Sequence, residues 1–354
     1  MSEPTSSLPA PLDWDQQVQP GVWVIPPPRQ RWWLYGLFLL LTFFSTMVVG
    51  ARMEFYFQHQ QPVFSLNDNT LDLFPIGWIA QHPANLLLGL PFSLTLMFIL
   101  FAHEMGHYLY ARHYRVYATP PLFVPCPYLS LFGTLGAFIR IKSPIPSRAA
   151  LFDIGIAGPI AGFIPACVAL IYGLSLSHPI AHSMDSGIEL GFPLIFELAG
   201  RLLHTNVPLS SLGLHPIAAA AWVGMFATSL NLLPAGQLDG GHIACSISPR
   251  LHRWTSRITV IALLPIGYYM WTGWFLWAVL LAFTLRHPQV PRYPDVTGGR
   301  RPLAVCAALI LILTFAPAPI AQSSGHEVWP KIRDGSRDTL RDLRDGIRHK
   351  LHRK

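Results

Sequence analysis

The residues of this sequence that could do chemistry begin with His103, Glu104 and His107, which belong to the string HEMGH. On an α-helix, side chains four residues apart project from the same face, so the two imidazoles could bind one zinc ion together. The carboxylate of Glu104 would lie beside the metal and could act as a general base toward a water molecule. The string therefore predicts a zinc-dependent hydrolytic site with Glu104 as its catalytic residue.

This candidate site lies in an apolar segment. Residues 85–111 contain no Asp, Glu, Lys or Arg apart from Glu104. Ionisable side chains at bilayer depth are energetically costly, and where they occur they usually have a function. The whole sequence has the same character, because 51% of its 354 residues are hydrophobic and only 12% are charged. That balance excludes an ordinary soluble enzyme and predicts a multi-spanning membrane protein.

Runs of about 20 apolar residues predict the elements that must position the site. They indicate an all-α polytopic membrane protein built as a bundle of about six transmembrane helices. The predicted spans are residues 33–51, 85–111, 150–177, 214–233, 257–285 and 302–321. We favour a single helix over the span at 257–285, with two short helices broken near Pro265 and Gly273 as the alternative. Ser147 is expected to cap the N-terminus of the span at 150–177.

The spans divide the chain into three regions. A proline-rich cytoplasmic tail (1–32) precedes the transmembrane metalloprotease core (33–321), and a basic amphipathic tail (322–354) follows it. The last tail suits a helix lying on an anionic membrane surface, although a solvated charged helix is the simpler interpretation. Because it carries much of the formal net charge of +7, that charge does not indicate a nucleic-acid partner.

Charge bias predicts how the core lies in the membrane. The segment after the second span is rich in positive charge, contributed by Arg112, Arg115, Arg140, Lys142 and Arg148. Cytoplasmic loops are enriched in such residues, so His107 is expected within one to two helical turns of the cytoplasmic side. We therefore predict a multi-pass integral membrane protein, placed in a bacterial plasma (inner) membrane, with its active site near the cytoplasmic side.

A catalytic zinc needs three protein ligands and an open position, and HEMGH supplies two ligands. Asp239 is the candidate for the third, in the string NLLPAGQLDGGH that follows the span at 214–233. Pro234 and the neighbouring glycines would let the chain turn the carboxylate inward. An Asp in a glycine-rich turn is often only a turn residue. The presence of a two-histidine site at the same predicted depth favours the ligand role.

Three further polar residues have weaker assignments. Asn231 could donate its amide to a developing oxyanion or support Asp239, but it could also bond a carbonyl freed by the proline break. His242 could support a metal ligand or could simply begin a helix. Asp153 is expected to complement the N-terminus of its helix rather than to contact zinc. Small residues on two spans predict close helix contact around the site, namely Gly106, Gly158 and Gly162.

In the order of its motifs, the chain resembles the site-2 protease family of intramembrane zinc metalloproteases. Three strings carry the resemblance over about residues 85–320: HEMGH, LFGTLGAFIRIKSPIPSRAALFDIGIAGPIAG and NLLPAGQLDGGH. The resemblance implies zinc bound by His103, His107 and Asp239, with Glu104 catalytic. It also implies cleavage of a peptide bond within or next to a transmembrane segment of a membrane-protein substrate.

The resemblance is to the branch without an inserted PDZ domain, which includes plastid and cyanobacterial relatives. Residues 178–213 are too few for a folded domain of that kind. Residues 122–141, which contain Gly133 and Gly136, predict a membrane-dipping β-hairpin near the active site. Its edge could accept an unwound substrate as an added strand, or the segment could be a re-entrant loop that fills the core.

Two other classes of function compete with the protease. A catalytically silent zinc-binding scaffold would keep the metal ligands, but such proteins commonly lose the base, and Glu104 is present. A metal transporter should place ionisable residues through the whole thickness of the membrane. Here the ionisable residues gather near one side, so the transporter ranks last.

Overall fold

The computed structural model describes residues 31–64, 71–128, 130–180, 190–203, 207–285, 290–291, 296 and 298–320. The α-helices are α1 (Trp32–Gln58), α2 (Ile76–Gln81), α3 (Leu90–His113), α4 (Arg148–Leu176), α5 (Leu194–Leu203), α6 (Pro216–Leu232), α7 (Asp239–Ile247), α8 (Pro249–Tyr269), α9 (Gly273–Phe283) and α10 (Arg300–Thr314). Two 3₁₀ helices are η2 (Pro83–Gly89) and η3 (Leu209–Ser211), and the strands are β1 (Leu122–Pro125), β2 (Thr134–Phe138), β3 (His178–Pro179) and β4 (Leu212–Gly213). The predicted tails lie outside the described residues, apart from residues 31 and 32, of which Trp32 begins α1.

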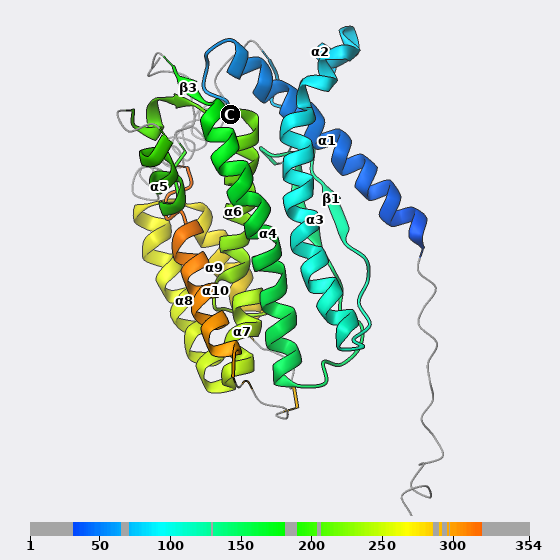
Figure 1. Cartoon of the computed structure of the whole chain (residues 1–354), viewed down its shortest axis with the longest axis vertical. Helices are drawn as coiled ribbons and strands as arrows, with labels where there is room; N and C mark the ends of the chain where they lie inside the picture. The colour runs from blue at the N-terminus through cyan, green and yellow to red at the C-terminus, as the bar shows by residue number, and fades with distance from the viewer. Residues whose placement is uncertain are drawn as a thin grey trace, which may run out of the picture.

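The fold is a mainly helical bundle with two small antiparallel sheets (Figure 1). Among the described residues, three helical segments are long and apolar enough to cross a membrane: α1, the continuous stretch Pro83–His113 that joins η2 to α3, and α4. They agree with the first three predicted spans. Ser147 caps α4 as expected, because its hydroxyl accepts a hydrogen bond from the backbone N–H of Ala150 over 3.1 Å. The fourth predicted span forms α6, whose 17 residues make a shorter apolar helix.

The prediction of one helix over residues 257–285 is wrong, and the alternative of two helices is confirmed, with the break before Gly273 and not at Pro265. The chain forms α8 and α9, separated by a break at residues 270–272, and the two helices pack side by side as a hairpin (Figure 1). The helix continues through Pro265 and ends four residues later. After the break, Trp274 is fully buried and its indole N–H donates to the carbonyl oxygen of Pro317 over 2.7 Å. This burial, which depends on a distant segment, fixes α9 as a separate helix.

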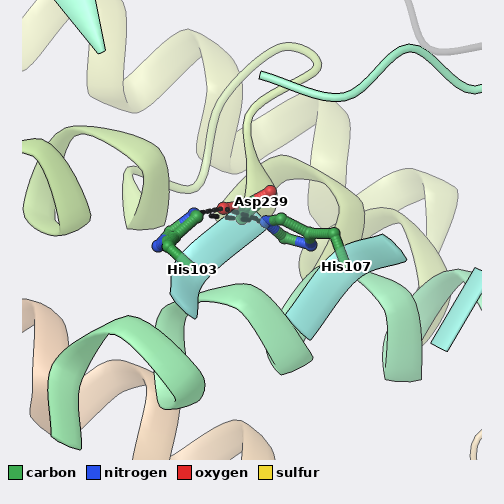
Figure 2. Close-up of side chains that lie close together, drawn as sticks. All are labelled: His103, His107 and Asp239. Carbon is green, nitrogen blue, oxygen red and sulfur yellow. Dashed lines mark hydrogen bonds and ion pairs between the residues drawn. The ribbon is translucent and has the colours of Figure 1, made fainter. Parts of the chain in front are cut away.

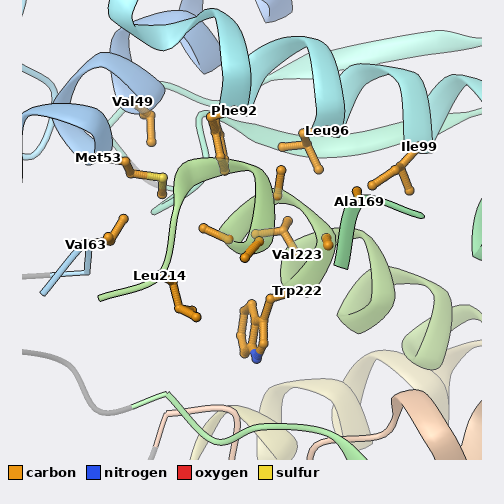
Figure 3. Close-up of a cluster of buried hydrophobic side chains, with 14 of the residues drawn as sticks. Val49, Met53, Val63, Phe92, Leu96, Ile99, Ala169, Leu214, Trp222 and Val223 are labelled. Carbon is orange, nitrogen blue, oxygen red and sulfur yellow. The ribbon is translucent and has the colours of Figure 1, made fainter. Parts of the chain in front are cut away.

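The core of the bundle surrounds α6. Four consecutive alanines, residues 218–221, are fully buried, and Trp222 follows them. A helix that is apolar on every side is stable when neighbours cover it all round, and small side chains let those neighbours approach closely. Helices α1, α3 and α4 supply the cover, with Phe92 and Leu96 on one side of α6 and Trp222 projecting from the other (Figure 3). The last turn of α6 thereby reaches the helix that carries HEMGH.

The predicted β-hairpin is confirmed. Strands β1 and β2 pair antiparallel, with Leu122 opposite Phe138 and Val124 opposite Gly136. The turn between them rests on α1, where the hydroxyl of Ser45 donates to the carbonyl oxygen of Gly133 over 2.5 Å. Gly133 has a φ of +76°, and a Cβ there would lie 2.7 Å from the carbonyl oxygen of Ser45, so the turn requires glycine.

Candidate metal centre

The structure brings His103, His107 and Asp239 together at one point between α3 and the start of α7 (Figure 2). The Nε2 atoms of the two histidines are 3.2 Å apart. Each of them is also 3.2 Å from Oδ2 of Asp239. Two potential ligand atoms from α3 and one from a residue 132 positions after His107 thus form a triangle of equal sides.

The triangle fits a zinc ion. Tetrahedral zinc with bonds of about 2.0–2.1 Å holds its ligand atoms about 3.3–3.4 Å apart. The Nδ1 atom of His107 lies 2.7 Å from the carbonyl oxygen of Ile154. Because a carbonyl only accepts, Nδ1 carries the hydrogen and the lone pair of His107 is on Nε2, facing the carboxylate. A carboxylate oxygen and two imidazole nitrogens turned toward one point form a donor set that a zinc ion would hold together.

Local sequence explains how each side chain reaches this point. The i, i+4 spacing on α3 aims both imidazoles in one direction, and both rings are buried. Helix α6 ends at Leu232, where Pro234 prevents it from continuing, and α7 begins at Asp239 itself. The carboxylate therefore projects from the first residue of a helix, 14% exposed, toward the two histidines.

The close contact of α3 with α4 that the sequence predicted is present, and glycines on α4 also allow the two histidines to fit against that helix. A Cβ on Gly158 would overlap the imidazole of His107, and one on Gly162 would lie 2.9 Å from Cβ of His103. Gly106, between the two histidines, contacts the backbone of Ala157 so closely that a Cβ would overlap it. The pair of glycines four apart on α4 thus matches the pair of histidines four apart on α3.

Replacing Gly158 by alanine is expected to weaken zinc binding by about tenfold or more. Over-packing of a tight contact costs about 1–3 kcal/mol, and here the added methyl group displaces a proposed ligand. Zinc affinity is measured by competition with a chelator in detergent. Gly36→Ala on α1 is the matched control, because no atom lies within 4 Å of the position that its Cβ would take. Parent-like affinity in Gly158→Ala would contradict the packing argument.

Glu104 lies next to the triangle without being part of it. Its side chain is buried, 6% exposed, and it interacts electrostatically with His103, His107 and Asp239. The backbone of Ile139, directly after β2, lies near its carboxylate. The β-hairpin therefore borders the residue predicted as the general base.

The other predicted residues are placed as follows. The amide nitrogen of Asn231 lies 3.3 Å from Nε2 of His103, so this side chain borders the metal position. His242 is half-buried on α7, where its Cβ faces Gly155 of α4, and it is not in the group of potential ligand atoms. The structure thus supports a place beside the triangle for Asn231 and a helix-packing position for His242.

Asp153 is outside the group of potential ligand atoms, as expected, but the interpretation that it complements its helix N-terminus is wrong, because it does not lie in the first turn of α4. Its carboxylate accepts two hydrogen bonds from the guanidinium of Arg300 at 2.9 and 2.7 Å, and one from the hydroxyl of Tyr114 at 2.5 Å. Burial and the hydrogen bond to Asp153 raise the pKa of Tyr114. This cluster joins α4, α10 and the end of α3. Asp153 directly precedes Ile154, whose carbonyl oxygen orients His107. Sequence reasoning missed it, because nothing in the local pattern relates residues 147 apart.

The sequence is similar to a known family of peptidases and to several of its members. The family model of peptidase family M50 matches residues 91–272. The chain is 32% identical over 241 residues to the probable zinc metalloprotease EGY2, chloroplastic, of Arabidopsis thaliana, covering 66% of this chain and 42% of that protein. It is 27% identical over 314 residues to the probable zinc metalloprotease EGY1, chloroplastic, of Oryza sativa subsp. japonica, covering 82% of this chain and 52% of that protein.

A third relative, the probable zinc metalloprotease EGY2, chloroplastic, of Oryza sativa subsp. indica, is 29% identical over 312 residues, which cover 86% of this chain and 52% of the relative. The chain thus spans about half the length of the curated relatives it matches. The matched region contains both HEMGH and Asp239. The resemblance to the site-2 protease family is therefore confirmed, and the chain belongs to peptidase family M50.

Proposed function

We propose that this protein is an intramembrane zinc metalloprotease, which hydrolyses a peptide bond within or next to a transmembrane segment of a membrane-protein substrate. The observation that carries the proposal is the triangle of His103, His107 and Asp239 ligand atoms beside the buried carboxylate of Glu104. Two of the three proposed ligands and the base lie on a helical segment long and apolar enough to cross a membrane. Membership in peptidase family M50 supports the same reaction.

The residues divide the chemistry between them. His103, His107 and Asp239 would hold the metal, and zinc, when bound, acidifies a water molecule and polarises the carbonyl of the scissile bond. Glu104 accepts one proton of the attacking water as the carbon–oxygen bond forms. It then delivers that proton to the leaving nitrogen as the carbon–nitrogen bond breaks, so that the products are a carboxyl group and an amine.

We assign Asn231 to the carbonyl oxygen of the substrate. Its amide nitrogen is 3.3 Å from Nε2 of His103, so a carbonyl bound at the metal position would lie within its reach. An amide donor aimed at developing negative charge typically contributes about two to three orders of magnitude to the rate. His242 has no part in this proposal beyond packing α7 against α4.

The β-hairpin is suited to presenting the substrate. The backbone N–H of Thr119 donates to the carbonyl oxygen of Arg140, so the backbone of Arg140 faces the strand partner. Because backbone groups alternate along a strand, those of Ile139 face the opposite edge, where Ile139 meets Glu104. A substrate helix must unwind before its carbonyls can be attacked, and the unwound segment could add to this edge as a further strand.

The proposal places the protein in a lipid bilayer, as a bundle of about six transmembrane helices. Large apolar side chains face outward on α3 and α4, including Leu94, Phe98, Ile164 and Val168, each at least 55% exposed. Contact with lipid accounts for such exposure. The active site would lie near the cytoplasmic side, with a membrane protein as substrate and no nucleic acid as partner. The relatives are chloroplastic by name, which gives no support to a bacterial plasma membrane.

Cleavage of a single-span test protein in reconstituted vesicles tests the reaction. The protein should produce two fragments whose masses locate the cut inside the apolar segment, or within a few residues of it, nearer its cytoplasmic end. A zinc chelator should abolish the products. Placing Gly or Pro residues near the cut should increase cleavage, because both residues weaken the substrate helix. Products that persist at the parent rate with zinc removed would contradict the zinc mechanism.

The alternatives are a catalytically silent zinc-binding scaffold and a metal transporter. Either would bind zinc without cleaving any test protein. The transporter is disfavoured by the place of the ionisable residues, since His103, His107 and Asp239 converge on one point instead of lining a path.

A further inference from the structure

The loop between α6 and α7, residues 233–238, determines where the carboxylate of Asp239 points. It joins the last residue of α6 to Asp239, the first residue of α7. Gly236 lies in this loop with a φ of +58°, a conformation that glycine adopts without strain. A Cβ on Gly236 would lie 2.6 Å from Oγ1 of Thr284, just beyond α9. The loop is therefore confined to one path over the ends of the α8–α9 hairpin.

Side chains of α8 bind both backbone polar groups of Gly236. Nε2 of His252 donates to the carbonyl oxygen of Gly236 over 2.8 Å. The backbone N–H of Gly236 donates to the hydroxyl oxygen of Ser256 over 3.2 Å. His252 and Ser256 are one helical turn apart and almost fully buried, at 2% and 1% exposure. Because buried backbone groups must find partners, these two side chains hold the loop at a defined place.

The same part of the loop packs directly against the first turn of α7. A Cβ on Gly241 would lie 2.7 Å from the carbonyl oxygen of Ala235, and it would overlap the carbonyl oxygen of Gly236. The backbone N–H of His242 donates to the carbonyl oxygen of Leu238 over 2.8 Å, which starts the helix. Gly236 thus lies between α8 and the turn that begins with Asp239, and any shift of Gly236 moves that turn.

We propose that His252, together with Ser256, is a positioning residue for the metal centre. The pair fixes Gly236, and through the tightly packed first turn of α7 it fixes the direction of the Asp239 carboxylate. This inference rests on the proposed role of Asp239 as a zinc ligand. It assigns to α8, a helix with no residue in the triangle, a part in holding the metal.

The test compares zinc release in four variants of the full chain in detergent. His252→Leu removes the donor to Gly236 and should speed the release of zinc to a chelator by about tenfold, the lower end for residues that support metal ligands. Ser256→Ala should speed release by less than His252→Leu does, because its hydroxyl is the more distant partner of Gly236, at 3.2 Å instead of 2.8 Å. His252→Gln restores an N–H donor and should recover most of the loss. Thr314→Val is the control, because it deletes a buried hydroxyl that bonds the carbonyl of Ile310 within α10.

A second readout separates positioning from general stability. The unfolding temperature of each metal-free variant is measured, and the positioning role predicts values for His252→Leu and Thr314→Val that differ little. A lower unfolding temperature for metal-free His252→Leu, with zinc released at the parent rate, would overturn the proposal. If His252→Leu does not fold, the rate of zinc release from Ser256→Ala is the test. Release from Ser256→Ala at the parent rate would then overturn the proposal.

His103→Ala is measured alongside as a reference for the zinc site itself. Loss of zinc in His103→Ala with parent-like release in His252→Leu would end the positioning proposal and leave the proposed function intact. Zinc that His103→Ala retains as firmly as the parent would remove the zinc site, and both proposals would fail.

Discussion

Alanine in place of His103 or His107 should remove most of the zinc from the protein, which otherwise should hold about one zinc ion per chain. Each replacement deletes one of three ligand atoms that lie 3.2 Å apart. Residues that merely support metal ligands change affinity by about 10–100-fold, so the loss of a ligand should exceed about 100-fold. Metal analysis of the purified protein in detergent measures the result directly, after passage over a column that removes loosely bound ions.

The carboxylates supply a matched pair of controls for this measurement. Asp239→Asn should weaken zinc binding, because it removes the charged ligand of the triangle. Asp153→Asn should leave zinc largely in place, because that carboxylate is bound to Arg300 and Tyr114 instead. Undiminished zinc in both histidine variants would remove the ligand assignment. Equal loss in both aspartate variants, in folded protein, would mean that the wrong carboxylate had been chosen.

The metal centre was largely predictable because short stretches of sequence around each of its residues carry the signal. The spacing within HEMGH specifies two side chains on one helix face whatever surrounds them. Asp239 could be found because an acid is rare in so apolar a sequence, and because the proline and glycines near it mark the end of a helix. Close packing of the two spans at Gly106, Gly158 and Gly162 was predicted from the spacing of small residues, but the contact of Gly158 and Gly162 with the histidines was not. The assignment of these residues as ligands and base nevertheless remains a prediction.

What the sequence could not reveal depends on contacts between distant segments. The sequence offered the break between α8 and α9 only as an alternative, because what stabilises it is Trp274, whose hydrogen-bond partner Pro317 is 43 residues away. Asp153 sits in the second turn of its helix, and only the folded chain brings Arg300 to it across 147 residues. The central position of α6 shows the same limit, since its apolar pattern has no polar face from which its neighbours could be inferred.

The most direct test of the protease proposal is the loss of cleavage in Glu104→Gln. Glutamine keeps the shape of the side chain, and Glu104 is not one of the three ligand residues, so the variant should fold and bind zinc like the parent. It cannot accept a proton from water, so turnover should stop. General acid–base groups contribute about 10²–10⁴-fold to a rate, which would reduce product below detection in an ordinary assay.

The decisive measurement is therefore fragment production from single-span proteins in vesicles, made with parent and Glu104→Gln at equal zinc content. The account predicts fragments from the parent, none from the parent with chelator, and none from Glu104→Gln. Equal behaviour of the parent and Glu104→Gln across several substrates, native membrane extracts included, would contradict the protease and leave the zinc-binding scaffold in its place.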